Sequence, residues 1–236
     1  MSPQRGPVLP YKIVAGVTPV RHKWLVASAK MAGSTFAPEE ANLYDSFREV
    51  VDMRPALSAL VVNAPIGYRS TRQEPQRQCD VEVRAMLGRR GVTIRRSPTR
   101  GVISRGKALP SDHLDAVTLT LLPVVLEVAS EMSSYRQRTT YEGSPELSFY
   151  FLNGAVPLRW SKLREEGRQE RRQLLLAKVP GIERIIDVSI RGVSSHHLLD
   201  AGALLMSARR AQSHAAQRVP LHPEWDSEGL RMEYVY

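Results

Sequence analysis

Hydrophobic and polar residues alternate along three short segments near the N-terminus. Residues 11–17, 23–29 and 33–36 each show this pattern, which is typical of strands with one buried face. Their connections are short, so we expect them to form an antiparallel meander. A fourth segment, 59–62, is apolar throughout and stops at the turn residues 63–67, which predicts a buried strand.

Apolar residues recur at helical spacing over much of the remaining chain. The spacing predicts a helix over residues 38–53 and a longer one over 111–132, with Ser111 as a cap and Pro123 as a kink. The tail from residue 219 is expected to be irregular as far as a strand at 230–235. Further helices are expected at 74–87, 145–151, 163–177 and 195–212, and a further strand at 138–141.

The order of these elements predicts the fold class. Three hairpin-linked strands, a helix and a further buried strand describe an α/β protein with a mixed sheet, antiparallel strands plus parallel ones, flanked by helices. We expect an irregular leader at 1–10, a single domain at 11–218 with a helical basic insertion at about 70–135, and a C-terminal tail at 219–236.

Composition excludes several classes of protein. The longest apolar run, near residues 117–128, is too short and too interrupted to cross a bilayer, so no membrane partner is expected. Residues 1–10 lack the apolar centre of a secretory signal, which favours a cytoplasmic location. Cys79 is the only cysteine, so an intramolecular disulfide and a thiolate zinc cluster are both excluded.

The formal net charge of +9 favours a polyanionic partner, and its distribution is uneven. Residues 83–111 contain no Asp or Glu. We expect this basic segment to contact the phosphates of nucleic acid, either DNA or RNA; the alternative is a solvated loop. Its eight cations are Arg84, Arg89, Arg90, Arg95, Arg96, Arg100, Arg105 and Lys107.

Seven short motifs, in order along the chain, resemble the DUF429 family of predicted nucleases. They are Val14-Ala15-Gly16-Val17-Thr18; Val61-Val62-Asn63-Ala64-Pro65-Ile66-Gly67-Tyr68; Arg77, Asp80 and Arg84 with Leu87-Gly88; Ser97-Pro98-Thr99-Arg100; Glu142 with Pro145-Glu146-Leu147-Ser148-Phe149; Ser161-Lys162 with Glu166-Gly167 and Arg171; and Leu198-Leu199-Asp200-Ala201. The resemblance implies an RNase H-like fold. It also implies phosphodiester hydrolysis by paired Mg²⁺ or Mn²⁺ ions on a cluster of carboxylates.

The sequence departs from the family pattern at two acidic positions. Thr18 and Asn63 stand where the family usually has Asp. Glu146 and Asp200 remain as the implied catalytic carboxylates and metal ligands. Because two divalent ions need several anionic ligands, we expect hydrolysis to be weakened or lost. Glu142, His197 and Lys162 are expected close to the site.

Each candidate also has a simpler interpretation. Glu146 could serve only the electrostatics of a helix start. Asp200 could lie on an exposed helix face, and Lys162 on the surface. His196 and His197 share a helix face with Asp200 and could be solvated. Asp80 and Arg84, four residues apart, are expected to form an intrahelical ion pair.

Two other functions remain open at this point. One is a non-catalytic nucleic-acid-binding or regulatory module on the same scaffold, with binding that depends on salt and not on magnesium. The other is a protein-interaction module, for example a homodimer, in which the arginines pair with an acidic partner.

Overall fold

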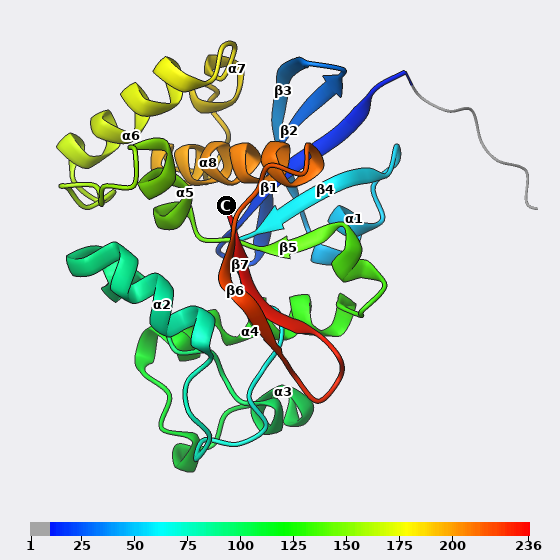
Figure 1. The fold of residues 1–236 in the computed structure, drawn as a ribbon, viewed down its shortest axis with the longest axis vertical. Coiled ribbons are helices and arrows are strands. Elements are labelled where there is room, and N and C mark those ends of the chain that lie inside the picture. Colours follow the sequence, from blue (N-terminus) through cyan, green and yellow to red (C-terminus); the bar gives the residue numbers. More distant parts are fainter. Residues whose placement is uncertain (1–9) are drawn as a thin grey trace, which may run out of the picture.

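A computed structural model describes residues 10–236, so the predicted leader at 1–10 lies almost wholly outside the described residues. Strands β1 (Lys12–Val20), β2 (Lys23–Ala32) and β3 (Thr35–Tyr44) form the expected antiparallel meander. Strand β4 (Leu57–Val62) runs parallel to β1, and β5 (Thr140–Glu142) runs parallel to β4. The resulting order, β3-β2-β1-β4-β5, confirms the mixed sheet of an RNase H-like arrangement (Figure 1).

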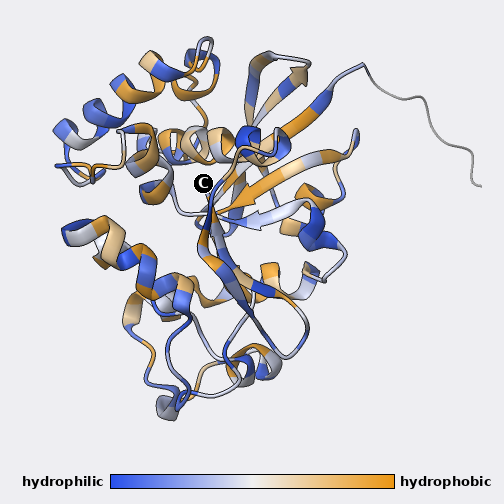
Figure 2. Ribbon diagram, in the orientation of Figure 1, coloured by the Kyte–Doolittle hydropathy of each residue, from blue (hydrophilic) through white to orange (hydrophobic). Residues whose placement is uncertain are grey.

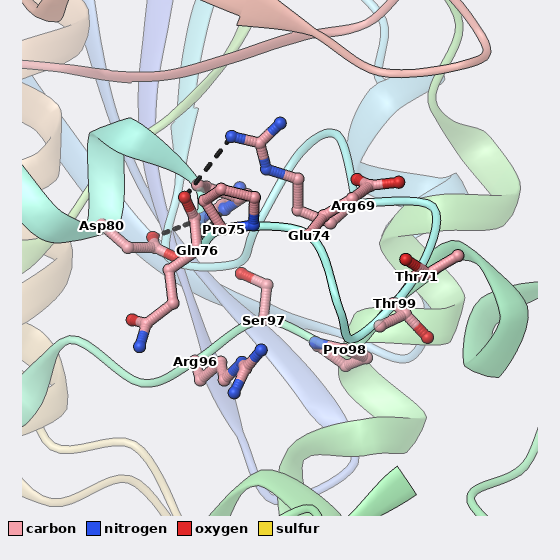
Figure 3. Close-up of a pocket in the computed structure, with 11 residues that line it drawn as sticks. Arg69, Thr71, Glu74, Pro75, Gln76, Asp80, Arg96, Ser97, Pro98 and Thr99 are labelled. Carbon is pink, nitrogen blue, oxygen red and sulfur yellow. Dashed lines mark hydrogen bonds and ion pairs between the residues drawn. The ribbon is translucent and has the colours of Figure 1, made fainter.

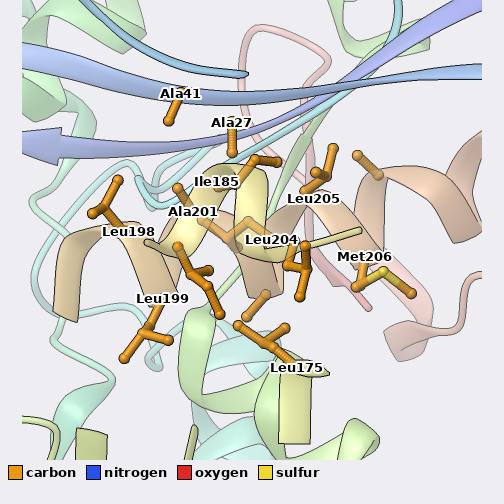
Figure 4. Packing of buried hydrophobic residues seen from close by; sticks show 14 of the residues in the cluster. Ala27, Ala41, Leu175, Ile185, Leu198, Leu199, Ala201, Leu204, Leu205 and Met206 are labelled. Atoms are coloured by element: carbon orange, nitrogen blue, oxygen red, sulfur yellow. The ribbon is translucent and has the colours of Figure 1, made fainter. Parts of the chain in front are cut away.

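One face of the sheet is covered by the long helix α8 (Ser195–Gln212), with α5 (Pro145–Leu152), α6 (Glu165–Lys178) and α7 (Glu183–Ile186) around it. Leucines and alanines of α8 pack between the strands and α6 and α7 (Figure 4). The backbones of β1 and α8 approach closely at Gly16, because a Cβ there would lie 2.2 Å from the carbonyl oxygen of Ala201. The glycine therefore determines how deeply α8 sits on the sheet.

The opposite face is covered by α1 (Phe47–Val51) and α4 (Ala116–Glu131). Trp24 of β2 packs on Phe47, with 4.8 Å between the ring centroids. Its indole N–H donates to Glu127 of α4 at 2.9 Å. Helices on both faces give a three-layer architecture. Figure 2 shows the inner strand β4 as apolar, as expected for a strand buried on both sides.

The helix predicted over residues 38–53 is wrong in its first half. Residues 38–44 belong to β3 and pair with β2, and the helix is limited to Phe47–Val51. Pro38 and the two glutamates after it resemble a helix start. As an edge strand, however, the segment gains hydrogen bonds from β2, and only Phe47 and Val50 of the helix are buried.

The insertion consists of short helices joined by loops. After α2 (Gln78–Leu87) come a 3-10 turn at Gly88–Thr93, helix α3 (Arg100–Arg105), a second turn at Pro110–Asp112, and α4. Helix α4 begins later than expected, with Asp115 as its cap instead of Ser111, and Pro123 lies within it. A third turn, Arg136–Arg138, replaces the first part of the strand expected at 138–141.

The C-terminal tail is a hairpin, so the expectation of irregular chain before residue 230 is wrong. Strands β6 (Arg218–Trp225) and β7 (Arg231–Val235) pair antiparallel, with a register shift between Val219 and Glu224. Pro220 and Pro223 obscure this strand in the sequence. In Figure 1 the hairpin runs between the sheet and the insertion. Its Asp226 accepts hydrogen bonds from Arg100 and from the backbone of Tyr68, which joins the two parts.

Candidate functional site

The site lies where β1, β4 and β5 end. These strands are mutually parallel, so Thr18, Asn63 and Glu142 meet at one edge of the sheet, as sites in α/β proteins usually do. The N-terminal turns of α8 bring Asp200 and His197 to the same edge, and all five residues line one cleft of about 530 Å³. The structure therefore brings together the residues that the sequence predicts to be close to the site.

Two neutral side chains occupy the centre of the cleft floor. The amide of Asn63 donates to the hydroxyl of Thr18 at 3.3 Å. Thr18 is 1% exposed and lies two residues after Gly16, on the face of β1 that packs on α8. The resemblance noted in the sequence leads us to expect aspartates at these two positions, and here two neutral side chains contact each other instead.

Asp200 is buried and bound to a lysine. The ammonium of Lys162 donates to Oδ2 of Asp200, whereas Oδ1 is buried and accepts no hydrogen bond from the described residues. Burial raises the pKa of Asp200, and the nearby Lys162 opposes this rise. The ion pair replaces the alternatives in which Asp200 is exposed and Lys162 is an isolated surface residue.

Glu146 is held by two arginines. Its Oε1 accepts from Arg171 at 2.6 Å and from Arg90 at 2.7 Å. Arg171 is fully buried and also donates to the carbonyl oxygens of Trp160 and Gly167. Glu146 lies in the first turn of α5, as the sequence indicates, but the two arginines neutralise its carboxylate.

Glu142 belongs to a buried network that fixes the edge of the sheet. Both its oxygens accept from Arg77, at 2.8 and 2.7 Å, and Oε2 also accepts from the backbone of Ile66 at 2.7 Å. Arg77 reaches Asp80 at 2.6 Å, and Tyr234 of β7 donates to the same Asp80 oxygen at 3.1 Å. The network joins the turn after β4, α2, β5 and the C-terminal hairpin.

The expected ion pair between Asp80 and Arg84 is therefore wrong. Asp80 turns inward to Arg77. Arg84 donates to the carbonyl oxygen of Ile94 at 2.9 Å and to the side chain of Gln76 at 2.5 Å. A buried carboxylate needs a buried cation more than a surface contact between neighbouring turns, because desolvation strengthens the first interaction.

The two histidines at the start of α8 pack on each other, with 4.1 Å between ring centroids. Nδ1 of His197 lies 2.8 Å from Oγ of Ser194, the residue that caps the helix. Burial, together with the adjacent His196 and Lys162, lowers the pKa of His197 to about 4. His197 is therefore neutral and partly buried, which differs from the alternative of a solvated histidine pair.

This shift predicts a loss of stability in mild acid. Unfolded His197, with a pKa of about 6.5, binds a proton that the folded state excludes until about pH 4, so the free energy of unfolding falls as pH drops through this interval. We expect His197→Gln to make that fall shallower in denaturant titrations at pH 7, 6 and 5. His22→Gln, at an exposed turn, is the control and keeps the slope of the wild type. Equal slopes in all three proteins would contradict the assignment.

The donor set at the cleft does not fit paired divalent ions. Each of the three carboxylates is bound to a cation of the same chain, and the two other floor residues are neutral. Among residues 10–236 no group of three or more His, Cys, Asp or Glu side chains is arranged to hold a metal ion. Glu146 and Asp200, the predicted ligands, are close enough for Glu146 to raise the pKa of Asp200, but they form no shared cage.

The walls of the cleft are of two kinds. One wall is cationic and polar. It contains Arg90, Arg95 and Arg96 from the basic segment, together with Lys162. The other is an apolar stripe of α4, formed by Val117, Leu121, Val124 and Val125. We did not expect this stripe of α4 to line the site. Its only sequence signal was that α4 has more apolar positions than one buried face requires.

The eight cations of the basic segment divide into two groups. Arg90, Arg100 and Arg105 pair with Glu146, Asp226 and Asp112, while Arg84 binds backbone and amide oxygens. The remaining four form no ion pair with a carboxylate within the described chain, and all four are exposed. These four, Arg89, Arg95, Arg96 and Lys107, remain the candidates for contact with phosphate.

A second pocket lies beside the cleft, between residues 69–77 and 96–99 (Figure 3). Its volume of about 10 Å³ leaves space for a single water molecule. Asp80 and Arg96 line it. The pocket is thus a packing gap behind the buried network and not a ligand site.

One family model matches this chain. It covers residues 16–225, most of the described protein, and its description is a protein of unknown function (DUF429). No curated protein matches the chain, and no solved structure matches it. No helix in the described part is long and apolar enough to cross a membrane.

Proposed function

The chain belongs to the DUF429 family, and we propose that it binds the phosphodiester backbone of nucleic acid without hydrolysing it. The observation that carries the proposal is that Glu142 and Asp200, which line the cleft, and Glu146, which is bound by Arg90 of the cleft, are each paired with a cation of the same chain. This pairing removes the anionic ligands that a hydrolytic metal site requires. It leaves cationic groups at the rim that phosphate can reach.

Phosphodiester hydrolysis by two divalent ions depends on an excess of negative charge at the site. The two cations bind the attacking and leaving oxygens, and several carboxylates balance their positive charge. Here Lys162 neutralises Asp200, while Arg90 and Arg171 neutralise Glu146. A divalent cation would therefore have to displace these partners before it could bind.

The exposed arginines at the rim of the cleft are the groups that we expect to bind phosphate. Arg95 and Arg96 line the cleft, are exposed and have no carboxylate partner within residues 10–236. A guanidinium group can contact two phosphate oxygens at once without losing an existing ion pair. Arg90 and Lys162 stand further in, half-buried, and extend the same positive potential towards the floor.

Binding can be measured by fluorescence anisotropy of a labelled oligonucleotide at several salt concentrations. If Arg95 and Arg96 each neutralise one phosphate, the double variant Arg95→Gln/Arg96→Gln should lower the slope of log affinity against log salt by about 1.4 on single strands. Its affinity should fall by about tenfold or more at low salt. Arg184→Gln is the control, because Arg184 is exposed on α7, which packs against β3 at the far edge of the sheet.

The same samples test for hydrolysis. We expect binding to be unchanged by magnesium, manganese or a chelator, and the labelled strands to remain intact. Cleavage that needs a divalent ion and disappears in Glu146→Gln and Asp200→Asn would overturn the loss of catalysis. Binding that is insensitive to salt and to Arg95→Gln/Arg96→Gln would overturn the proposal as a whole.

A further inference from the structure

The cleft contains more than a phosphate backbone requires. Its volume of about 530 Å³ lies in the range of small-molecule sites. Phosphate and sugar are polar, yet one whole wall is the aliphatic stripe of α4. Val117 and Leu121 of this stripe are 43% and 37% exposed, which leaves apolar surface facing the open cleft.

Resting on the proposed function, we propose that the cleft receives one unpaired nucleotide, with its base against α4 and its phosphate on the arginine rim. In a duplex the faces of the bases are stacked on one another, so an apolar wall can contact only a base that is unpaired or at a strand end. The ligand class is therefore single-stranded or frayed nucleic acid.

The floor supports the same ligand. Oδ1 of Asp200, a residue that lines the cleft, is buried and accepts no hydrogen bond within residues 10–236. The hydroxyl of Thr18, which lines the same cleft, accepts from Asn63 and still has its own proton to donate. A phosphate group offers only acceptors at neutral pH. The amino groups of a base and the hydroxyls of a sugar offer the donors that an orphaned carboxylate oxygen needs.

The charged and the apolar side chains of the cleft lining come from different elements. Arg95 and Arg96 come from the segment before α3, whereas Val117 and Leu121 lie on α4. The exposed side chains of Val92 and Leu163 extend the apolar surface at the mouth. A nucleotide between these walls would bury its base while its charge stays at the solvent edge.

The test compares three labelled probes of equal length at fixed salt: a single strand, the same strand with abasic sites, and its duplex, which carries the higher charge density. We expect the single strand to bind about tenfold tighter than the abasic strand and the duplex, which corresponds to the contribution of one base contact. Leu121→Gln and Val117→Ser should each weaken the single strand about fivefold and leave the abasic strand unchanged.

Leu119→Gln is the matched control, because Leu119 lies on the same helix, is 45% exposed and does not line the cleft. Its binding of all three probes should equal that of the wild type. If the three probes bind alike, still salt-dependently, and the Leu121 and Val117 variants change nothing, the nucleotide pocket is wrong and the proposed function stands. If no probe binds in a salt-dependent way, the proposed function itself fails.

Discussion

Replacing Arg77 with methionine is expected to lower the free energy of unfolding by about 3–5 kcal/mol, a cost typical of removing one partner from a buried ion pair. Arg77 is 2% exposed, and its side chain lies between the carboxylates of Asp80 and Glu142. Methionine fills a similar volume but leaves both negative charges buried without a cation. The carbonyl oxygens of Ile66 and Gly67 lose a donor as well.

Chemical denaturation at neutral pH measures this effect, with Arg172→Met as the matched control. Arg172 pairs with Asp187 at 2.8 Å, but both side chains are more than 40% exposed, so its loss should cost less than about 1 kcal/mol. Equal destabilisation by the two substitutions would show that the Arg77 network contributes little. The network spans four elements, so we also expect Arg77→Met to reduce binding at the cleft.

Gly16→Ala is expected to destabilise the protein by about 3 kcal/mol, at the upper end of what overpacking usually costs. The added Cβ would lie 2.2 Å from the carbonyl oxygen of Ala201 and 2.2 Å from the backbone nitrogen of Leu205. Both neighbours are backbone atoms of α8, so no side chain can rotate away. Strand and helix must separate, and the core between them loses contacts.

Gly101→Ala is the control for the same chemical change. Gly101 lies in α3, and a Cβ there meets only side-chain atoms, the nearest at 3.4 Å from Arg105. Alanine in a helix reduces the entropy of the unfolded chain, so this variant should be neutral or slightly more stable. A Gly16→Ala protein that melts within 2 °C of the wild type would contradict the close approach, since about 1 kcal/mol shifts the melting temperature by more than this.

The family motifs have different physical roles from those that the sequence suggests. Arg77 and Asp80, with Glu142, support the edge of the sheet from behind. Arg171 holds Glu146 in place from a fully buried position. Glu142 also lines the cleft, as do Thr18, Asn63, Lys162 and Asp200, whereas Arg77, Asp80, Glu146 and Arg171 do not. A motif match thus identifies which residues gather at the site, but the contacts decide which of them a ligand can reach.

The sequence alone predicts the features that depend on neighbours along the chain. The patterns at residues 11–17 and 23–29 predict β1 and β2, the apolar run 59–62 predicts β4, and the spacing of Leu198, Ala201 and Leu205 predicts α8. The order of these elements predicts the mixed sheet. It also places the ends of β1 and β4 side by side, which predicts that Thr18 and Asn63 lie close together. The hydrogen bond between them agrees with this prediction.

Only the tertiary structure decides which charged residues form ion pairs with one another. Arg77 and Glu142 are separated by 65 positions, and Arg100 and Asp226 by 126. The strength of such pairs depends on burial, which removes water from around both groups, and burial is a property of the packed chain. The sequence contains eight cations in the basic segment. Packing pairs three of them with carboxylates and leaves Arg89, Arg95, Arg96 and Lys107 exposed without a carboxylate partner within residues 10–236. The same packing turns α4 towards the cleft and makes its apolar stripe a wall of the site.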